Sequence, residues 1–262
     1  MSVGSAGDLE GICAAGAAAA QVLDVMLRAV EPGVTPMELN DIGAVEMSGL
    51  GARSAPMLSV GFPAETCISV NHAIAHGIPA KEALVDGDLV NIDVSLELDG
   101  YFADTGSSVP VAPGHSTLDH LCATGRRALE RALGEVRAGG LLNRLGWAAE
   151  ETARAAGYEI VRDLCGHGVG RSLHEEPREI PGYYDPRDRR RLEEGAVLAI
   201  EPFVSTGARH VVTLADGWTL VTEDGGLAVQ FEHTVVVTSG GALVVTAKEP
   251  FLIPSGGAEL SA

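Results

Sequence analysis

Residues 90–106, VNIDVSLELDGYFADTG, predict two apolar strands joined by the dipeptide Asp99-Gly100. An Asp-Gly pair between two strands is a strong signal for a two-residue hairpin loop, because both of its residues tolerate a positive φ angle. Counting back from that loop places Asp93 on the same face of the hairpin as Asp104, diagonally across from it. The two carboxylates are then close enough to converge on metal ions.

A pair of aspartates on one face of an apolar hairpin needs a partner. A single aspartate in such a strand is usually an edge or turn feature. Two on one face must be protonated, salt-bridged or occupied by a cation, because like charges in a half-buried sheet are costly. The neighbouring sequence offers no lysine or arginine to pair with them. Asp93 and Asp104 are therefore candidate metal ligands.

Three further candidate ligands lie downstream in apolar strands or glycine-rich turns. They are His167 in CGHGVG, Glu201 in VLAIEP and Glu232 in VQFEHTV. A lone histidine in a glycine-rich turn is more often a turn residue than a ligand, but a carboxylate inside an apolar strand needs a partner. Two Asp, two Glu and one His can hold two divalent ions about 3.5–4 Å apart, with bridging carboxylates and a shared water.

Two histidines, His76 and His174, lie in loops beside this set. For each, a surface or hydrogen-bonded structural role explains the residue as well as a functional role does until its surroundings are known. A third histidine, His72, is expected to be a surface residue.

The order of elements predicts a duplicated α+β unit around one sheet. Helices are expected over residues 8–28, 35–49, 116–136 and 142–156. In the second helix, Thr35, Pro36 and Glu38 are typical of a capping box, and in the first, Asp8 is the expected cap. Strands are expected over residues 66–70, 89–98, 101–109, 158–161, 197–204, 211–214, 218–222, 229–238 and 242–245, after a loop over 51–64. Because no linker separates the halves, residues 1–262 are expected to form one domain.

Composition excludes several classes of protein. The net charge of −18 disfavours nucleic acid binding, which needs a basic surface. The apolar run over residues 14–27 is too short and too polar to span a bilayer, and Asp8 and Glu10 stand where a signal peptide needs positive charge. The four cysteines lie far apart without a C-x-x-C pair, which favours a reducing cytoplasm over a disulfide framework or a structural zinc site.

In combination, the motifs make the chain resemble the type I methionine aminopeptidases, which are pita-bread metallopeptidases, from about residue 7 to residue 245. The motifs are His-Gly-Ile-Pro, Asn-Ile-Asp-Val with Asp-Thr downstream, Gly-His-Gly-Val-Gly, His-Glu-Glu-Pro, Ile-Glu-Pro and Gln-Phe-Glu-His-Thr. The resemblance implies a pita-bread fold of pseudo-twofold, duplicated helix-helix-strand units around a curved, antiparallel-rich sheet. It also implies a monomeric, cytoplasmic enzyme, near the ribosome, that removes the N-terminal methionine of new polypeptides.

The resemblance also assigns a role to each candidate ligand. Asp93 would bind one divalent ion, His167 and Glu201 would bind the other, and Asp104 and Glu232 would bridge both. A water between the two ions would be the nucleophile that attacks the first peptide bond. Cobalt, manganese, iron and zinc are all compatible with this mostly oxygen ligand set.

Catalytic and substrate-binding roles follow from the same resemblance. Glu201 would be the general base, His174 would stabilise the oxyanion and His76 would contact the scissile amide nitrogen. The methionine pocket would be lined by Phe62, Cys67, Leu173 and Trp218. The sequence departs from the family at Leu173, where an aromatic residue usually precedes His-Glu-Glu-Pro, and this bears on the strictness for methionine.

Two other interpretations compete with this one. A proline-specific peptidase of the same fold would normally carry a separate N-terminal domain, for which the chain has no room. A catalytically dead binding module would be expected to lose metal ligands, whereas all five are present here. The chain also lacks a long insertion between His174 and Glu201, which argues against the type II enzymes.

Overall fold

The computed structural model describes residues 1–256. Its helices are α1 Ala6–Arg28, α2 Pro36–Gly49, α3 Ala55–Val60, α4 Ser116–Leu133 and α5 Asn143–Ala155. Its strands are β1 Arg53–Ser54, β2 Cys67–Val70, β3 Ala73–Ala75, β4 Leu89–Leu98, β5 Tyr101–Pro110, β6 Glu159–Ile160, β7 Cys165–Gly168, β8 Glu175–Pro181, β9 Val197–Ile200, β10 Phe203–Ser205, β11 Val211–Thr213, β12 Leu220–Thr222, β13 Ala228–Gln230, β14 His233–Val237, β15 Gly241–Val244 and β16 Phe251–Pro254.

The starts of the first two helices are set by local hydrogen bonds. In α2 the predicted capping box is present, with the Thr35 hydroxyl accepting from the Glu38 amide and the Glu38 carboxylate accepting from the Thr35 amide. The expected cap of α1 was wrong. Ser5 is the N-cap, and its hydroxyl accepts from the backbone amide of Asp8 inside the first turn.

The β4–β5 hairpin has the predicted register. Leu98 pairs with Tyr101 across the loop, and Ser95 pairs with Asp104. The loop residues Asp99 and Gly100 have φ angles of 50° and 82°, which a two-residue hairpin loop requires. The hairpin therefore presents its two aspartates on one face.

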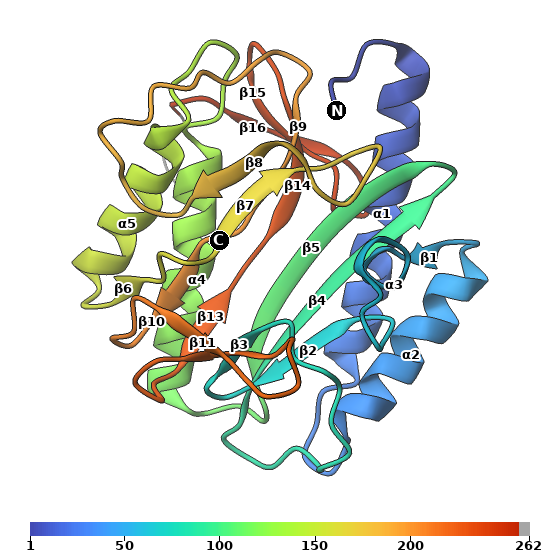
Figure 1. The fold of residues 1–262 in the computed structure, drawn as a ribbon, viewed down its shortest axis with the longest axis vertical. Helices are drawn as coiled ribbons and strands as arrows, with labels where there is room; N and C mark the ends of the chain where they lie inside the picture. The colour runs from blue at the N-terminus through green and yellow to red at the C-terminus, as the bar shows by residue number, and fades with distance from the viewer. Residues whose placement is uncertain (257–262) are drawn as a thin grey trace.

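The strands pair antiparallel throughout the described residues, but they form several hydrogen-bonded sheets rather than the one expected (Figure 1). One sheet contains the long hairpin, with β1 and β2 on the other edge of β4. A six-stranded sheet has the order β16-β15-β14-β9-β7-β8, and two three-stranded sheets complete the fold. Strands β5 and β14 lie side by side where the two larger sheets meet.

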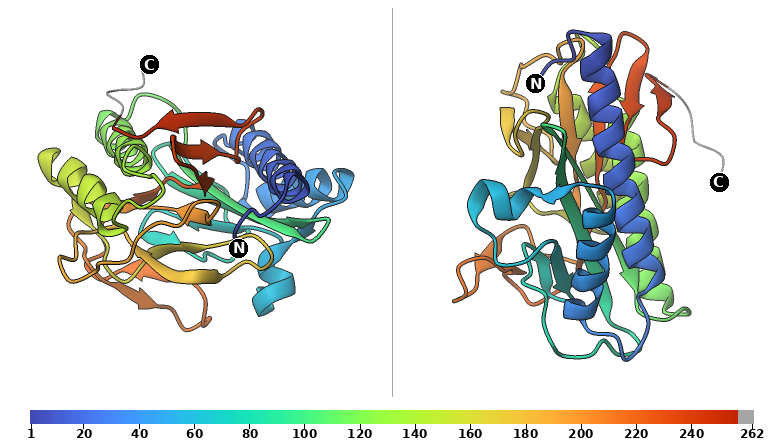
Figure 2. Two further views of the ribbon diagram at one scale, coloured as in Figure 1. Left: turned by 90° about the horizontal axis from the view of Figure 1, so that it is seen from above. Right: turned by 90° about the vertical axis from the view of Figure 1, so that its right-hand side faces the viewer.

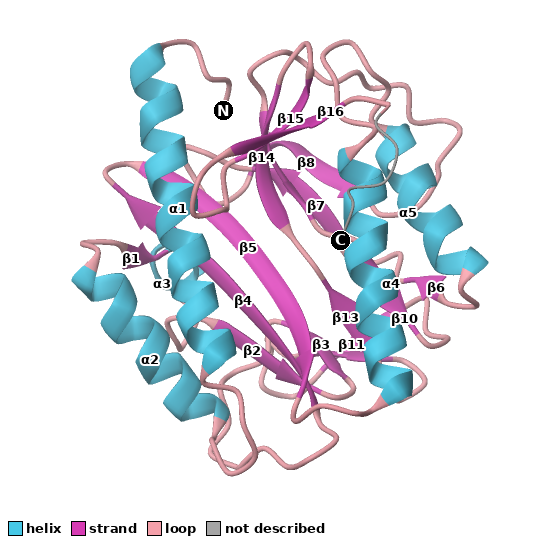
Figure 3. Ribbon diagram, turned by 180° about the vertical axis from the view of Figure 1, so that it is seen from behind, coloured by secondary structure: helices cyan, strands magenta, loops and turns pink. Residues whose placement is uncertain are grey.

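Each helix pair packs on its own half of the molecule. Helix α1 packs on the hairpin and α2 packs beside it on α1, β1 and β2, whereas α4 and α5 pack on the second half. All four helices lie on the same side of the long hairpin (Figure 3). Two large apolar cores result, one beneath each pair. The view from above also shows α1, in blue, and α4, in green, on the same side of the hairpin (Figure 2). This arrangement matches the predicted duplicated α+β unit and leaves the other face of the strands for a site.

Helix α1 is long and apolar enough to span a membrane by length and composition alone. Its buried face, which includes Ile12, Val22 and Met26, packs against β4, β5 and α2. It therefore contributes to the folded core, as apolar helices of globular proteins do.

Two predicted strands are each divided in two. The strand expected over residues 197–204 is interrupted at Glu201-Pro202, and the one expected over 229–238 is interrupted at Phe231-Glu232. Pro202 has no amide hydrogen to donate to a ladder, which explains the first interruption. The expected loop over 51–64 contains β1 and α3, and the short strands β3, β7, β8 and β16 were not predicted because they lack apolar alternation.

Candidate active site

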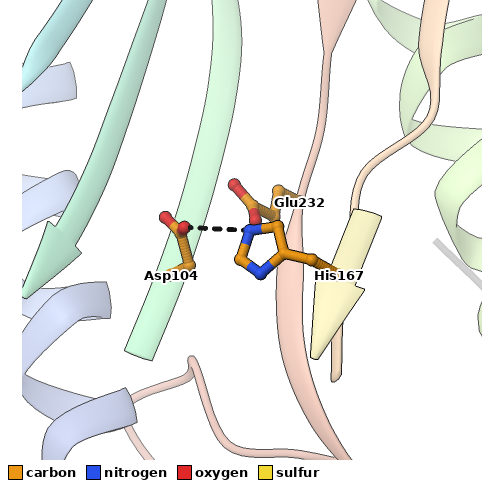
Figure 4. Close-up of side chains that lie close together, drawn as sticks. All are labelled: Asp104, His167 and Glu232. Carbon is orange, nitrogen blue, oxygen red and sulfur yellow. Dashed lines mark ion pairs between the residues drawn. The ribbon is translucent and has the colours of Figure 1, made fainter. Parts of the chain in front are cut away.

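Three ligand-type side chains from distant parts of the chain meet in the middle of the molecule (Figure 4). Asp104 comes from β5, His167 from β7 and Glu232 from the segment between β13 and β14. One ligand atom from each lies within 4.8 Å of the others. The imidazole Nε2 of His167 is 3.6 Å from Oδ2 of Asp104. All three residues are buried, with 6%, 6% and 2% of their surface exposed.

The other two predicted ligands border this group. Glu201 follows β9, and its Oε1 lies 3.7 Å from Nε2 of His167. Asp93 lies on β4 opposite Gly106, two residues from Asp104. Asp93, Asp104, His167 and Glu201 line one cavity of about 310 Å³. Glu232 does not line this cavity, but a ligand atom of it lies within 4.8 Å of Asp104 and His167, so the structure brings all five predicted ligands together.

Strand pairing across the two halves sets these positions. Strand β9 lies between β7 and β14, with Ala199 opposite His167. The Glu232 amide donates to the Gly106 carbonyl over 3.0 Å. The Thr234 hydroxyl, in turn, accepts from the Asp104 amide over 2.9 Å. These bonds join the hairpin directly to the segment that carries Glu232.

Burial and crowding shift the pKa values of the carboxyl groups. Burial, reinforced by the charges of Asp104 and Glu201, raises the pKa of Asp93 and Glu232 well above the ordinary range. Burial also raises the pKa of Glu201 to about 8, against the opposing charge of His167. A cation that enters this site lowers the pKa of these carboxyl groups, so they ionise as it binds.

Asp104 and His167 differ from these groups because each has a close partner. Burial opposes ionisation of Asp104, but hydrogen bonding to His167 and Ser95 holds its pKa below the usual value. Burial likewise opposes charging of His167, but Asp104 and Glu201 raise its pKa to about 9. In the metal-free protein these two residues therefore form an ion pair.

The donor set fits divalent cations. Two buried carboxylate oxygens, Oδ1 of Asp93 and Oε1 of Glu232, have no hydrogen-bond partner among the described residues. An unpaired buried oxygen is costly, and in a group of four carboxylates and one imidazole a cation is the natural partner. Such oxygen-rich ligation with one imidazole suits Mn, Fe, Co or Zn.

Two polar residues of the site were not predicted. The Ser95 hydroxyl donates to Oδ1 of Asp104 over 2.7 Å. The Gln230 amide nitrogen lies 2.9 Å from Glu232 and 3.3 Å from Glu201, and the Gln230 side chain accepts from Asn91. A signal was present, because Ser95 faces Asp104 in the register and Gln230 stands two residues before Glu232.

The loop histidines fall into two groups. His76 and His174 both line the cavity, and the ring of His174 lies 4.3 Å from that of His167, centroid to centroid. Partial desolvation and the charge of His167 lower the pKa of His174, which keeps it neutral. His72 is exposed in the turn between β2 and β3, as expected of a surface residue.

An apolar pocket adjoins the ligand group. Its walls include the four predicted pocket residues Phe62, Cys67, Leu173 and Trp218. The rings of Phe62 and Trp218 meet edge to face, with centroids 5.3 Å apart. Leu173 is 4% exposed. Apolar side chains and the carboxylates of the ligand group therefore line the same cavity.

Comparison with known proteins gives one consistent result. The model of metallopeptidase family M24 matches residues 10–239. Methionine aminopeptidase 2 of Bacillus subtilis is 42% identical over 88% of this chain and 93% of its own length. The crystal structure of methionine aminopeptidase from Rickettsia prowazekii superposes with a TM-score of 0.90 at 35% identity, covering 94% of this chain and 100% of that one. The enzyme from Thermotoga maritima gives a TM-score of 0.90 at 34% identity, with the same coverage.

Proposed function

Because the chain belongs to metallopeptidase family M24, we propose that it is a methionine aminopeptidase that hydrolyses the first peptide bond of polypeptides beginning with methionine. The likeness to solved structures confirms the pita-bread fold expected from the sequence. The observation that carries the proposal is the buried group of Asp104, His167 and Glu232 beside an apolar pocket. That pairing suits a reaction that combines metal chemistry with recognition of an apolar side chain.

The five carboxylate and imidazole side chains would hold two divalent ions. Asp93 would serve one ion, His167 and Glu201 the other, and Asp104 and Glu232 would lie between them. The ions, when bound, would supply a water of lowered pKa as nucleophile and would polarise the substrate carbonyl. The two unpaired oxygens of Asp93 and Glu232 support this assignment.

Glu201, His174 and His76 would act on the attacking water and on the substrate. Glu201 would accept a proton at its carboxylate from the attacking water and pass it to the departing amine. Neutral His174 would donate a hydrogen bond to the developing oxyanion. His76 would contact the scissile amide nitrogen. Their common place on the cavity wall supports these roles.

Substrate selection follows from the two ends of the cavity. The apolar end, formed by Phe62, Cys67, Leu173 and Trp218, would take the methionine side chain. The carboxylate end, with its ions bound, would anchor the free amine of the substrate, which restricts cleavage to the first residue. We propose a single catalytic domain that acts as a monomer on new polypeptides in the cytoplasm, near the ribosome.

The test is an activity assay with defined peptides. Purified protein loaded in turn with Mn, Fe, Co or Zn should release methionine from a peptide beginning Met-Ala. The same peptide with an acetylated amino terminus is the matched control and should remain intact. Absence of cleavage with every metal, or equal cleavage of the acetylated peptide, would contradict the proposal.

A further inference from the structure

The loop that carries Leu173 and His174 is held at its start by Arg171. One guanidinium nitrogen of Arg171 donates to Oδ1 of Asp8 over 2.8 Å and to the Tyr101 hydroxyl over 2.7 Å. The other donates to the Gly100 carbonyl over 3.3 Å. Arg171 thus connects the loop to the start of α1 and to the tip of the β4–β5 hairpin.

Packing around Tyr101 reinforces this contact. The guanidinium carbon of Arg171 lies 3.7 Å from the centroid of the Tyr101 ring. The ring in turn packs on α1 at Gly11, where an added Cβ would lie 2.1 Å from it. Beside it, the Phe102 amide donates to the Gly170 carbonyl over 2.7 Å. The loop therefore starts from a junction with several contacts, in which the Arg171 side chain is 49% exposed.

The end of the loop is closed by Glu175. Its Oε1 accepts from the amides of Arg171 and Ser172 over 2.7 and 2.9 Å. Inside the loop, the Ser172 hydroxyl donates to the His174 carbonyl over 3.2 Å. With both ends fixed, the loop has little freedom, and Leu173 and His174 face the cavity from it.

We propose that Arg171 is a positioning residue, which fixes His174 for its role in the proposed aminopeptidase reaction, on which this inference rests. Arg171 does not line the cavity, so it acts through the loop rather than on the substrate. Its planar fork reaches a carboxylate, a phenol and a carbonyl together, a geometry that lysine cannot reproduce. Displacement of a reacting group by about 1 Å is enough to cost about 10²-fold in rate.

The decisive experiment is a double-mutant cycle with His174, measured as kcat and KM on a Met-Ala peptide. Arg171→Ala should lower kcat by about 10²-fold with little change in KM or bound metal. In a His174→Ala background, Arg171→Ala should change kcat by less than about twofold, because the group that it positions is gone. Arg171→Lys should recover only part of the lost kcat.

Arg154→Ala is the matched control, because Arg154 is an exposed arginine on α5 that pairs with Glu150 and Glu151 and does not line the cavity. It should leave kcat unchanged. Equal losses from Arg171→Ala in both backgrounds, or loss of bound metal, would overturn the positioning role. A wild-type protein that cleaves no Met-Ala peptide would instead refute the proposed function, so the two failures are distinguishable.

Discussion

Asp93 and Asp104 occupy the same face of one hairpin but have opposite surroundings. Asp104 has two partners, His167 and Ser95, and its pKa lies below the ordinary value. Within residues 1–256, Asp93 has a buried oxygen without a hydrogen-bond partner, and burial beside Asp104 raises its pKa. Asp104 is therefore already charged before a cation arrives, and Asp93 ionises as the cation binds.

Replacing Asp104 tests the metal site directly. Asp104→Asn keeps the shape of the side chain but removes the charge, so bound divalent metal and activity on a Met-Ala peptide should both fall sharply. Elemental analysis of the purified protein and a peptide assay measure the two effects. Asp99→Asn makes the same charge change in the exposed hairpin loop and should alter neither. Unchanged metal and activity in Asp104→Asn would remove Asp104 from the ligand set.

Leu173 tests the strictness of the pocket. With leucine instead of an aromatic residue at position 173, the sulfur of the substrate methionine lacks an aromatic contact worth about 0.3–1.5 kcal/mol. Leu173→Phe should therefore raise the ratio of kcat/KM for methionine over leucine substrates by up to about tenfold. Peptides beginning Met-Ala and Leu-Ala measure that ratio. Leu58→Phe places a ring on exposed α3, outside the cavity wall, and serves as the control. An unchanged ratio in Leu173→Phe would show that this residue does not shape the pocket.

Two candidate ligands, Glu201 and Glu232, lie where strands are interrupted rather than inside strands. Glu201 follows the end of β9, and Glu232 immediately precedes β14, which pairs with β9. Leaving the ladder frees each side chain from strict alternation between two faces. Both carboxylates can then turn toward His167.

The sequence predicted the hairpin well because its signals are local. The Asp99-Gly100 loop fixes the register, and the register places Asp93 and Asp104 on one face. The position of His167 was not predictable in the same way, because its strand is short and glycine-rich and depends on pairing with β9. The contact of Gln230 with Glu201, 29 residues away in the chain, was missed for the same reason.

Close approach of β7 to β9 depends on Gly166. A Cβ at this position would lie 2.3 Å from the Ala199 carbonyl oxygen, so Gly166→Ala must push the strands apart. We expect a loss of about 1–3 kcal/mol in the free energy of unfolding and weaker metal binding, because His167 is the next residue. Urea unfolding and metal titration measure these effects. Gly134→Ala, whose Cβ would meet its nearest atom at 3.5 Å, should be close to neutral. Wild-type stability in Gly166→Ala would contradict this account.

For the whole molecule, metal and protons compete for the same buried oxygens. In the metal-free fold the pKa of Glu201 is about 8, whereas an unfolded glutamate titrates near about 4.3. Between these values the folded state holds a proton that the unfolded chain has released. Glu201 therefore makes its full contribution to the free energy of unfolding at pH values below its pKa in the unfolded chain. This contribution is lost as the pH rises through its pKa in the folded protein.

This linkage predicts how pH affects the stability of the metal-free protein and how many protons metal binding releases. Metal-free protein should become less stable to urea between about pH 5 and pH 8, and metal binding near pH 7 should release protons. Titration calorimetry in buffers with different ionisation enthalpies counts those protons. Glu201→Gln removes one of the titrating groups and should reduce the pH dependence of the metal-free protein, while Asp93, Glu232 and His167 retain the rest. A metal-free protein whose stability rises over this range would refute the assignment.

The hydrogen bonding between β5 and β14 also affects when the site can form during synthesis of the chain. Asp104 and Thr234, which hydrogen-bond to each other, lie 130 residues apart in the chain. A ribosome adds about 5–20 residues per second, so the first half waits several seconds or longer for its partner strand. The proposed metal site needs Glu232, so it cannot form until the chain has been synthesised as far as β14.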